Sequence, residues 1–324
     1  MRLIAGLCCA LALSFSVTSD IAFAQSAYPN KTVTVICTYG AGGGGDLIVR
    51  RYAAEMKGLA GQTFIVENRV GANGHIGNRA AMEAKPDGYT ILITGNSAFV
   101  GNPLVMKEAN YDPVDAMSPI ATLADIGLIL VVDAKSDIKS VADLTARLKA
   151  KNGEGKYAVA TVSHRMITPW YLQTIGAQAS EVGYKATADA INDITAGLVD
   201  FVFADATLAL AQAAQGRVRM LATTTKKRLS FAPDLPTLEE SGLSGMVYSV
   251  VWSAWAPKGT PDAIVTKLHN WFNTATNKDD IKKFLNQAGA EPIPLPTPQA
   301  MNDLMKDQFA LWKRLVQNAK LEKQ

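Results

Sequence analysis

A glycine-rich loop between two apolar segments is the stretch of this sequence best suited to bind a ligand. β-Branched residues from Thr32 to Ile36 predict a buried strand, residues 38–45 follow with four consecutive glycines, and a helical period of apolar residues begins after Asp46. Glycine allows positive φ and close approach of a ligand to the main chain, and the start of a helix presents unpaired N–H groups. The pattern predicts an anion-binding loop, because such N–H groups and the helix dipole favour negative charge.

The same loop also matches a dinucleotide-binding fingerprint. Gly40, Gly42 and Gly45 fit G-x-G-x-x-G after a strand, and Glu67 closes a second apolar run about 20 residues later. An NAD-dependent oxidoreductase is therefore one alternative. We expect no such cofactor, because the chain carries an export signal and nicotinamide cofactors are held in the cytoplasm. A P-loop is excluded, since no Lys-Ser/Thr pair follows the glycines.

The N-terminus has the pattern of a secretory signal peptide. Arg2 precedes an apolar run over residues 3–17, and Ala22-Phe23-Ala24 fits the small-residue cleavage pattern. The apolar core is shorter than the ~20 residues that span a membrane. We predict that residues 1–24 are removed after Ala24 and that the mature protein works in the periplasm.

Composition describes a globular protein without the charge of a nucleic-acid binder. The chain has 324 residues with 48% apolar content, enough for two domains. Lys and Arg (32) nearly balance Asp and Glu (29), and no long basic block occurs, so we expect no nucleic-acid partner. Cys37 is the single cysteine left after the signal peptide. We expect no internal disulfide and a thiol that packs as a small apolar group.

Beyond the loop, strands and helices alternate in the pattern of an α/β protein. The expected strands are residues 62–67, 89–94, 156–160, 181–184, 201–204 and 218–222, and the expected helices are residues 75–84, 141–150, 169–176, 188–196 and 208–215. Ligands of parallel sheets bind beyond the carboxyl ends of the strands. The binding rims are therefore predicted at the loops 38–45, 70–74, 94–97, 161–165, 185–187 and 205–207.

Two such α/β units predict two lobes with a hinged cleft between them. We assign residues 25–124 and 250–324 to the first lobe and residues 125–249 to the second. Apolar segments near 124–132 and 245–255 are expected to carry the chain from one lobe to the other.

Short motifs along the whole mature chain follow the order of a known family. They are Tyr39–Asp46 (YGAGGGGD), Val66–Ala72 (VENRVGA), Pro86–Thr90 (PDGYT), Tyr111–Pro113 (YDP), Gly183–Lys185 (GYK), Gly197–Phe201 (GLVDF), Asp234–Leu238 (DLPTL) and Ala256–Pro261 (APKGTP). In this order and at this spacing the chain resembles the extracytoplasmic solute receptors of tripartite tricarboxylate transporter systems, the TctC-like or Bug family.

The resemblance implies a two-lobed α/β periplasmic binding protein of the Venus-flytrap type, with parallel-rich sheets flanked by helices. It implies a monomer that closes on a small organic acid and delivers it to a tripartite tricarboxylate-type membrane transporter or to a sensor. In this family two facing first-lobe loops hold a ligand carboxylate through backbone groups, and the second lobe closes over it. Carried onto this sequence, the first-lobe residues are Tyr39, Gly40, Ala41, Gly42, Gly43, Gly44, Thr94, Asn96 and Ser97, and the second-lobe residues are Ser163, His164, Arg165, Thr187 and Asp205.

This sequence departs from the family pattern at several loop positions. Thr38 and Val70 stand where a proline is common, Gly45 where a threonine is common, and Ala186 where a glycine is common. The second-lobe loop 160–166 is also shorter and less glycine-rich than usual. These departures fall where the identity of the ligand should be set.

Several roles stay open at the level of sequence. Arg165 can grip a second carboxylate or form a solvated surface pair. Asp205 can bind a hydroxyl or amino group of the ligand or only cap a helix. Trp252 and Trp255 fit the core better than the cleft. Aliphatic dicarboxylates, tricarboxylates, aromatic acids and acidic amino acids all remain candidate ligands.

The sequence lacks the constellations that catalysis would need. No G-x-S-x-G elbow occurs, and no metal-ligand spacing joins the three histidines and Cys37. We therefore predict a binding protein with no metal and no enzymatic activity, and an exported hydrolase is the second alternative.

Overall fold

The structure is a computed structural model that describes residues 28–42, 44–184, 186–318 and 322–323. The predicted signal peptide, residues 1–24, lies outside the described residues. Within these described ranges, no helix combines the length and apolar character that crossing a membrane requires.

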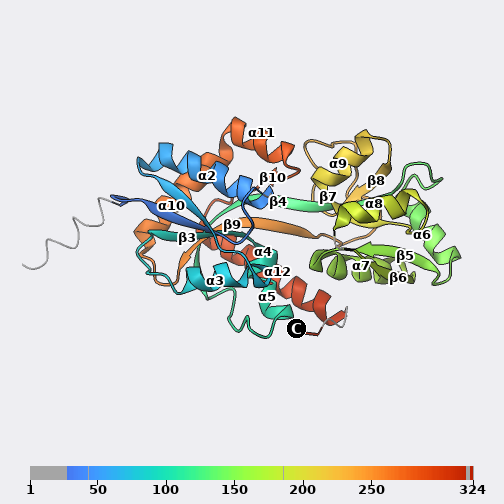
Figure 1. Cartoon of the computed structure of the whole chain (residues 1–324), viewed down its shortest axis with the longest axis horizontal. Helices are drawn as coiled ribbons and strands as arrows, with labels where there is room; N and C mark the ends of the chain where they lie inside the picture. Colours follow the sequence, from blue (N-terminus) through green and yellow to red (C-terminus); the bar gives the residue numbers. More distant parts are fainter. Residues whose placement is uncertain (1–27, 43, 185, 319–321, 324) are drawn as a thin grey trace, which may run out of the picture.

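The chain forms two lobes that lie end to end along the long axis of the molecule (Figure 1). The first lobe contains β1 (Val33–Cys37), α2 (Gly44–Ala60), β2 (Phe64–Asn68), the 3-10 turn η1 (Ala72–Gly74), α3 (His75–Met82), β3 (Thr90–Gly95), α4 (Asn96–Phe99), α5 (Asn102–Val105), α10 (Asp262–Asn277), α11 (Asp279–Gln287) and β10 (Glu291–Pro292). The second lobe contains α6 (Val141–Ala150), β5 (Gly155–Val159), α7 (Val162–Ile175), β6 (Ala179–Gly183), α8 (Thr187–Thr195), β7 (Val202–Asp205), α9 (Ala206–Ala214) and β8 (Val218–Thr223). Three long elements serve both lobes, namely β4 (Met117–Asp133), β9 (Ser249–Pro257) and α12 (Pro298–Asn318).

The short strands of each lobe that pair with one another do so in parallel, whereas the long strands β4 and β9 pair antiparallel with their neighbours. β1 pairs in parallel with β2 and β3, and β5 pairs in parallel with β6. β9 joins β3 to β4 with antiparallel pairing on both sides, and the end of β4 pairs antiparallel with β7 and β8. The predicted α/β fold is confirmed, with sheets that are mixed rather than uniformly parallel.

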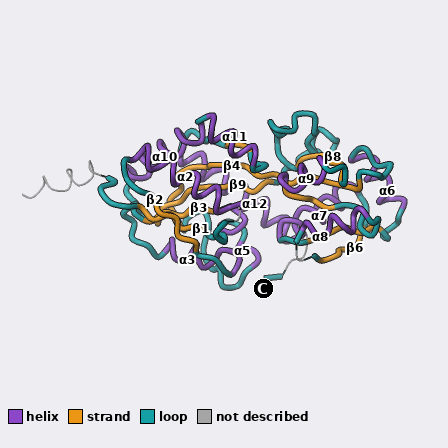
Figure 2. The backbone as a smooth tube through the Cα atoms, turned by 45° about the horizontal axis from the view of Figure 1, so that its top comes forward, coloured by secondary structure: helices purple, strands orange, loops and turns teal. Residues whose placement is uncertain are grey.

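β4 and β9 form the connection between the lobes, close to the predicted crossings (Figure 2). β4 is a single strand of 17 residues, which spans about 55 Å at ~3.3 Å per residue. Its first half pairs with β9 and β10, and its second half pairs with β7 and β8. A continuous strand of this length explains why the sequence shows two successive apolar runs in this region.

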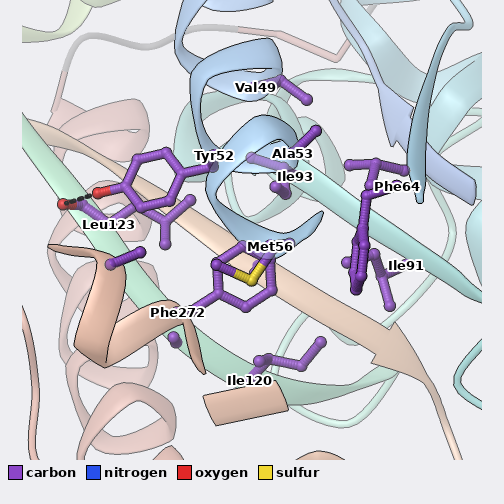
Figure 3. Close-up of a cluster of buried hydrophobic side chains, with 14 of the residues drawn as sticks. Val49, Tyr52, Ala53, Met56, Phe64, Ile91, Ile93, Ile120, Leu123 and Phe272 are labelled. Carbon is purple, nitrogen blue, oxygen red and sulfur yellow. Dashed lines mark hydrogen bonds between the residues drawn. The ribbon is translucent and has the colours of Figure 1, made fainter. Parts of the chain in front are cut away.

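The apolar period of α2 places one face of the helix in the first core. Ile48, Val49, Tyr52, Ala53 and Met56 recur at helical spacing and are all buried against the sheet (Figure 3). The Tyr52 hydroxyl donates a hydrogen bond to the carbonyl of Leu123 at 3.2 Å, which ties α2 to β4. Burial of one such large side chain stabilises the fold by about 1.5–3 kcal/mol, so these side chains hold the middle of α2 on the sheet.

The C-terminal helix α12 packs into the cores of both lobes. Met301 and Met305 lie in a cluster of the first lobe, whereas Trp312 and Leu315 lie in the main cluster of the second. The Trp312 ring stacks on Tyr248 with 5.9 Å between ring centroids. The sequence-based division assigned this whole segment to the first lobe, but an isolated helical pattern does not reveal that its two halves face different cores.

Helix α7 begins seven residues earlier than predicted, at Val162 rather than at Pro169. The Thr161 hydroxyl caps the helix by accepting a hydrogen bond from the backbone N–H of His164 at 3.3 Å. Pro169 therefore lies inside the helix, although proline favours a first-turn position. The residues predicted as a rim loop are instead the first turn of a helix.

Candidate functional site

A cavity of about 620 Å³ lies between the lobes, with walls from both of them. This volume is typical of sites for small-molecule ligands. Its lining residues are Tyr39, Asn73, Ser97, Gly101, Val105, Ile126, Leu128, Ala160, Thr161, Ser163, His164, Met166, Thr187, Asp205, Val250, Trp252 and Trp312. A hollow of about 750 Å³ elsewhere, bounded by segments 139–142 and 231–241, is lined by the second lobe alone. Of these two hollows, the interlobe cavity is the one that can couple binding to a change in the angle between the lobes.

The second-lobe wall is made from the starts of three helices. Ser163 and His164 lie in the first turn of α7, Thr187 begins α8, and Asp205 precedes α9. Each helix follows a strand, so their N-termini gather beyond the carboxyl ends of β5, β6 and β7. Their dipoles present positive ends to the cavity, and α8 has no side-chain cap of its own.

His164 is a neutral hydrogen-bond donor at the cavity. Its Nδ1 accepts a hydrogen bond from the backbone N–H of Ala160 at 3.0 Å, so the ring proton is on Nε2. Burial lowers the pKa of His164 to about 4, because a charged imidazolium would lose its hydration. At neutral pH this side chain therefore offers one N–H without a positive charge.

Asp205 caps helix α9 and also lies at the cavity wall. One carboxylate oxygen, Oδ1, accepts a hydrogen bond from the backbone N–H of Leu208 at 2.9 Å and so caps α9. The same side chain is exposed at the cavity wall. Capping uses one oxygen, which leaves the rest of the carboxylate facing the cleft.

Arg165 lies outside the set of cavity residues. Its guanidinium forms an ion pair with Glu181 at 3.1 Å, and its side chain is 46% exposed. Consecutive residues of a helix point about 100° apart, so His164 and Arg165 face different surroundings. Of the two roles that the sequence left open, the geometry matches the solvated surface pair.

The first-lobe wall is aromatic. Tyr39 and Trp252 are in contact, with 4.7 Å between ring centroids, and Ser97 lies beside them. A Cβ atom at Gly45 would lie 2.5 Å from Cη2 of Trp252 and 2.9 Å from Cγ of Tyr39, so only glycine fits beneath the pair. Gly45, where the family commonly has threonine, thus makes room for this aromatic wall.

The phenol of Tyr39 fills the space between the two first-lobe loops. A Cβ atom at Gly95 would lie 3.0 Å from the Tyr39 hydroxyl oxygen. Burial raises the pKa of Tyr39, against the opposite effect of hydrogen bonds with the Ser97 side chain and the Gly95 backbone. The hydroxyl therefore lies against the loop after β3, one of the two first-lobe loops that the family resemblance assigns to carboxylate binding.

The anion in the glycine loop is a carboxylate of the chain itself. The backbone N–H of Gly42 donates to Oδ2 of Asp46 at 2.8 Å, and Asp46 also accepts hydrogen bonds from Arg50 at 2.8 Å and Asn68 at 2.7 Å. These partners, Arg50 first, lower the pKa of Asp46 to about 2. The described glycine-loop residues Gly40, Ala41, Gly42 and Gly44 are exposed and are not among the residues that line the cavity, and Gly43 lies outside the described residues.

Two other predicted site residues lie beneath the cavity instead of lining it. Thr94 is buried, and its hydroxyl is 2.7 Å from that of Thr38. Asn96 is also buried, and its Oδ1 accepts a hydrogen bond from the backbone N–H of Val251 at 3.1 Å. Both side chains fix the end of β3, and Asn96 ties it to the start of β9. Cys37 is buried in the first core, as the sequence predicted.

Many lining residues were not among the individual site residues carried over from the family. They are Asn73, Gly101, Val105, Ile126, Leu128, Ala160, Thr161, Met166, Val250, Trp252 and Trp312, although Asn73 and Thr161 lie in the predicted rims 70–74 and 161–165. Most are apolar, and five of them, Ile126, Leu128, Val250, Trp252 and Trp312, lie on elements shared by the lobes, where local periodicity cannot separate core from cleft. In the part of the chain that the structure describes, no cluster of three or more His, Cys, Asp or Glu side chains is arranged to hold a metal ion.

Comparisons with known proteins identify relatives over nearly the whole chain. A profile described as "Tripartite tricarboxylate transporter family receptor" matches residues 48–321. "Protein BugT" of Bordetella pertussis is 29% identical over 307 residues, which cover 93% of this chain and 94% of that protein.

Solved structures agree with this relationship. The periplasmic binding protein BugD superposes with a TM-score of 0.72 at 30% identity, covering 92% of this chain and 100% of that one. An R. palustris protein solved with adipate superposes with a TM-score of 0.76 at 28% identity, again covering 92% of this chain and 100% of the other.

Proposed function

Because the chain belongs to the tripartite tricarboxylate transporter family of receptors, we propose that it captures a small organic acid between its lobes and delivers it to a membrane transporter of the tripartite type. The observation that carries this proposal is the cavity of about 620 Å³ with walls from both lobes. The R. palustris relative solved with adipate supports a carboxylate as the ligand.

The mechanism is closure about the strands β4 and β9. A ligand shifts the balance between open and closed forms only if it interacts differently with the two. An acid that touches Trp252 on one wall and Ser163 on the other gains its second set of contacts only on closure. The acid is then released unchanged to the transporter, without a catalytic step.

Export to the periplasm is part of the same proposal. Membership of a receptor family of periplasmic binding proteins supports this location. The removal of residues 1–24 is tested by the mass of the protein recovered from the periplasmic fraction, which is expected to begin at Gln25.

The test of function is a thermal-shift screen of the mature chain against mono-, di- and tricarboxylates, aromatic acids, amino acids and NAD. An acid present at about 100 times its Kd should raise the free energy of unfolding by about 2.7 kcal/mol. Stabilisation by one class of acid is the expected result. Stabilisation by NAD alone would contradict the receptor function and support the NAD-dependent oxidoreductase suggested by the G-x-G-x-x-G pattern.

A further inference from the structure

We propose that this receptor selects acids with a single carboxylate and an apolar, ring-sized body, and that Asp205 rejects a second carboxylate. The carboxylate faces the second lobe and the apolar body packs on the first. The inference rests on the proposed function, because it concerns the ligand of the same cavity.

The charge of the cavity wall is the first argument. Among the lining residues that the structure describes, Asp205 is the one Asp, Glu, Lys or Arg, so the charged group of this wall is a carboxylate. Arg165, the one arginine of the predicted site, is paired with Glu181, and neither residue is among those that line the cavity. A second ligand carboxylate would therefore approach a like charge without a counter-ion from the described walls, which raises its free energy in the cleft.

The state of the first-lobe loops is the second argument. The N–H of Gly42 is already bonded to Asp46, and the Tyr39 hydroxyl lies against Gly95 and Ser97. One backbone donor of the glycine loop and the Tyr39 hydroxyl thus already have partners within the chain. A ligand carboxylate finds free donors on the opposite wall.

The donors of the second lobe can hold one negative charge but are all neutral. They are the Nε2–H of His164, the hydroxyl of Ser163 and the first backbone N–H groups of α8, which no side chain caps. Neutral N–H and O–H donors at helix N-termini bind a single carboxylate well, because the helix dipole adds to each hydrogen bond.

The aromatic wall fixes the rest of the ligand. Tyr39 and Trp252 form a tilted pair that packs directly against the backbone at Gly45. Val250 and Ile126 are further apolar residues that line the cavity. Trp312 adds a further aromatic lining residue. Ring-sized apolar groups gain from such surfaces through burial and stacking.

The test is calorimetric titration with acids that differ only in a second carboxylate. The pairs are hexanoate with adipate, and 3-phenylpropionate with its para-carboxy derivative. We expect the wild-type chain to bind each monoacid at least about tenfold more tightly than its diacid, and the phenyl acid more tightly than hexanoate. Tighter binding of the diacids would overturn the inference while leaving the receptor function intact. If no acid binds in the titration, the proposed function itself is overturned.

The variant Asp205→Asn isolates the role of the charge. Asparagine caps helices about as well as aspartate, so α9 should keep its start and the protein its stability. We expect the diacids to gain about tenfold relative to the monoacids in this variant. An unchanged ratio would remove Asp205 as the selective group.

Lys185 stands two positions before Thr187 in the sequence and lies outside the described residues, so its substitution tests whether this lysine acts as a counter-ion to a second carboxylate. Lys185→Gln is expected to leave the ratio of monoacid to diacid affinity within about twofold. A selective loss of diacid binding in this variant would give the lysine the role of counter-ion and overturn the proposal.

Discussion

Gly45→Ala is the substitution that probes the aromatic wall most sharply. The added Cβ atom would lie 2.5 Å from Trp252 and 2.9 Å from Tyr39, closer than carbon atoms can approach. Overpacking of this kind costs about 1–3 kcal/mol. The helix propensity of alanine returns up to about 1 kcal/mol, since Gly45 lies in the first turn of α2. We expect a net loss of about 1–2 kcal/mol in the free energy of unfolding.

Gly44→Ala provides the control one residue away in the same helical turn. A Cβ atom at Gly44 meets no atom within 4 Å, so this variant gains helix propensity without a clash. Urea unfolding, followed by tryptophan fluorescence, measures both variants under the same conditions. Titration with 3-phenylpropionate measures the wall directly, and we expect about tenfold weaker binding by Gly45→Ala and unchanged binding by Gly44→Ala.

A second substitution separates the clash from other effects of the added methyl group. In the double variant Gly45→Ala with Trp252→Leu, the leucine removes the closest contact of the added methyl group. The double variant should therefore lose less stability than the sum of the losses of Gly45→Ala alone and Trp252→Leu alone. Equal stability and equal affinity of Gly45→Ala and Gly44→Ala would refute the packing of the tryptophan over Gly45.

Three further substitutions test individual charges of the structure. Arg165→Ala is expected to leave acid affinity within about twofold, because the guanidinium pairs with Glu181 at the surface; a large loss of diacid affinity in titration would return Arg165 to the site. The pKa of His164 is lowered to about 4 in the folded state, so between about pH 6.5 and 4 the unfolded chain binds more protons and the free energy of unfolding falls as the pH falls. His164→Gln should reduce this fall, and urea unfolding at pH 7 and pH 4.5 measures it. Asp125→Asn should stabilise the protein above about pH 6, because burial and then the charge of Glu291 raise the pKa of Asp125 to about 6; the gain should vanish near pH 4, and a gain that persists there would contradict it.

The sequence predicts the architecture well because the periodicities of the core are local. The buried face of α2 follows from helical spacing between Ile48 and Met56, and the Thr32 to Ile36 run defines β1 from its β-branched residues. Strand ends then place Tyr39, Ser97, Thr187 and Asp205 at one cleft, as the rule for parallel strands requires.

The direction of individual side chains could not be predicted in the same way. Asp46 follows the glycines in sequence, but its capture of the Gly42 N–H depends on Arg50 and Asn68 from neighbouring turns and strands. Trp312 reaches the cavity from the far end of the chain, and nothing in its own helical pattern indicates this. Tertiary packing decides both cases.

The most direct test of capture between two lobes is small-angle X-ray scattering of the mature chain with and without a saturating acid. The acid is the one that raises the unfolding temperature most in the screen. Closure about β4 and β9 predicts a smaller radius of gyration in the presence of the acid. An acid that raises the unfolding temperature but leaves the radius of gyration unchanged would contradict closure as the mechanism of capture.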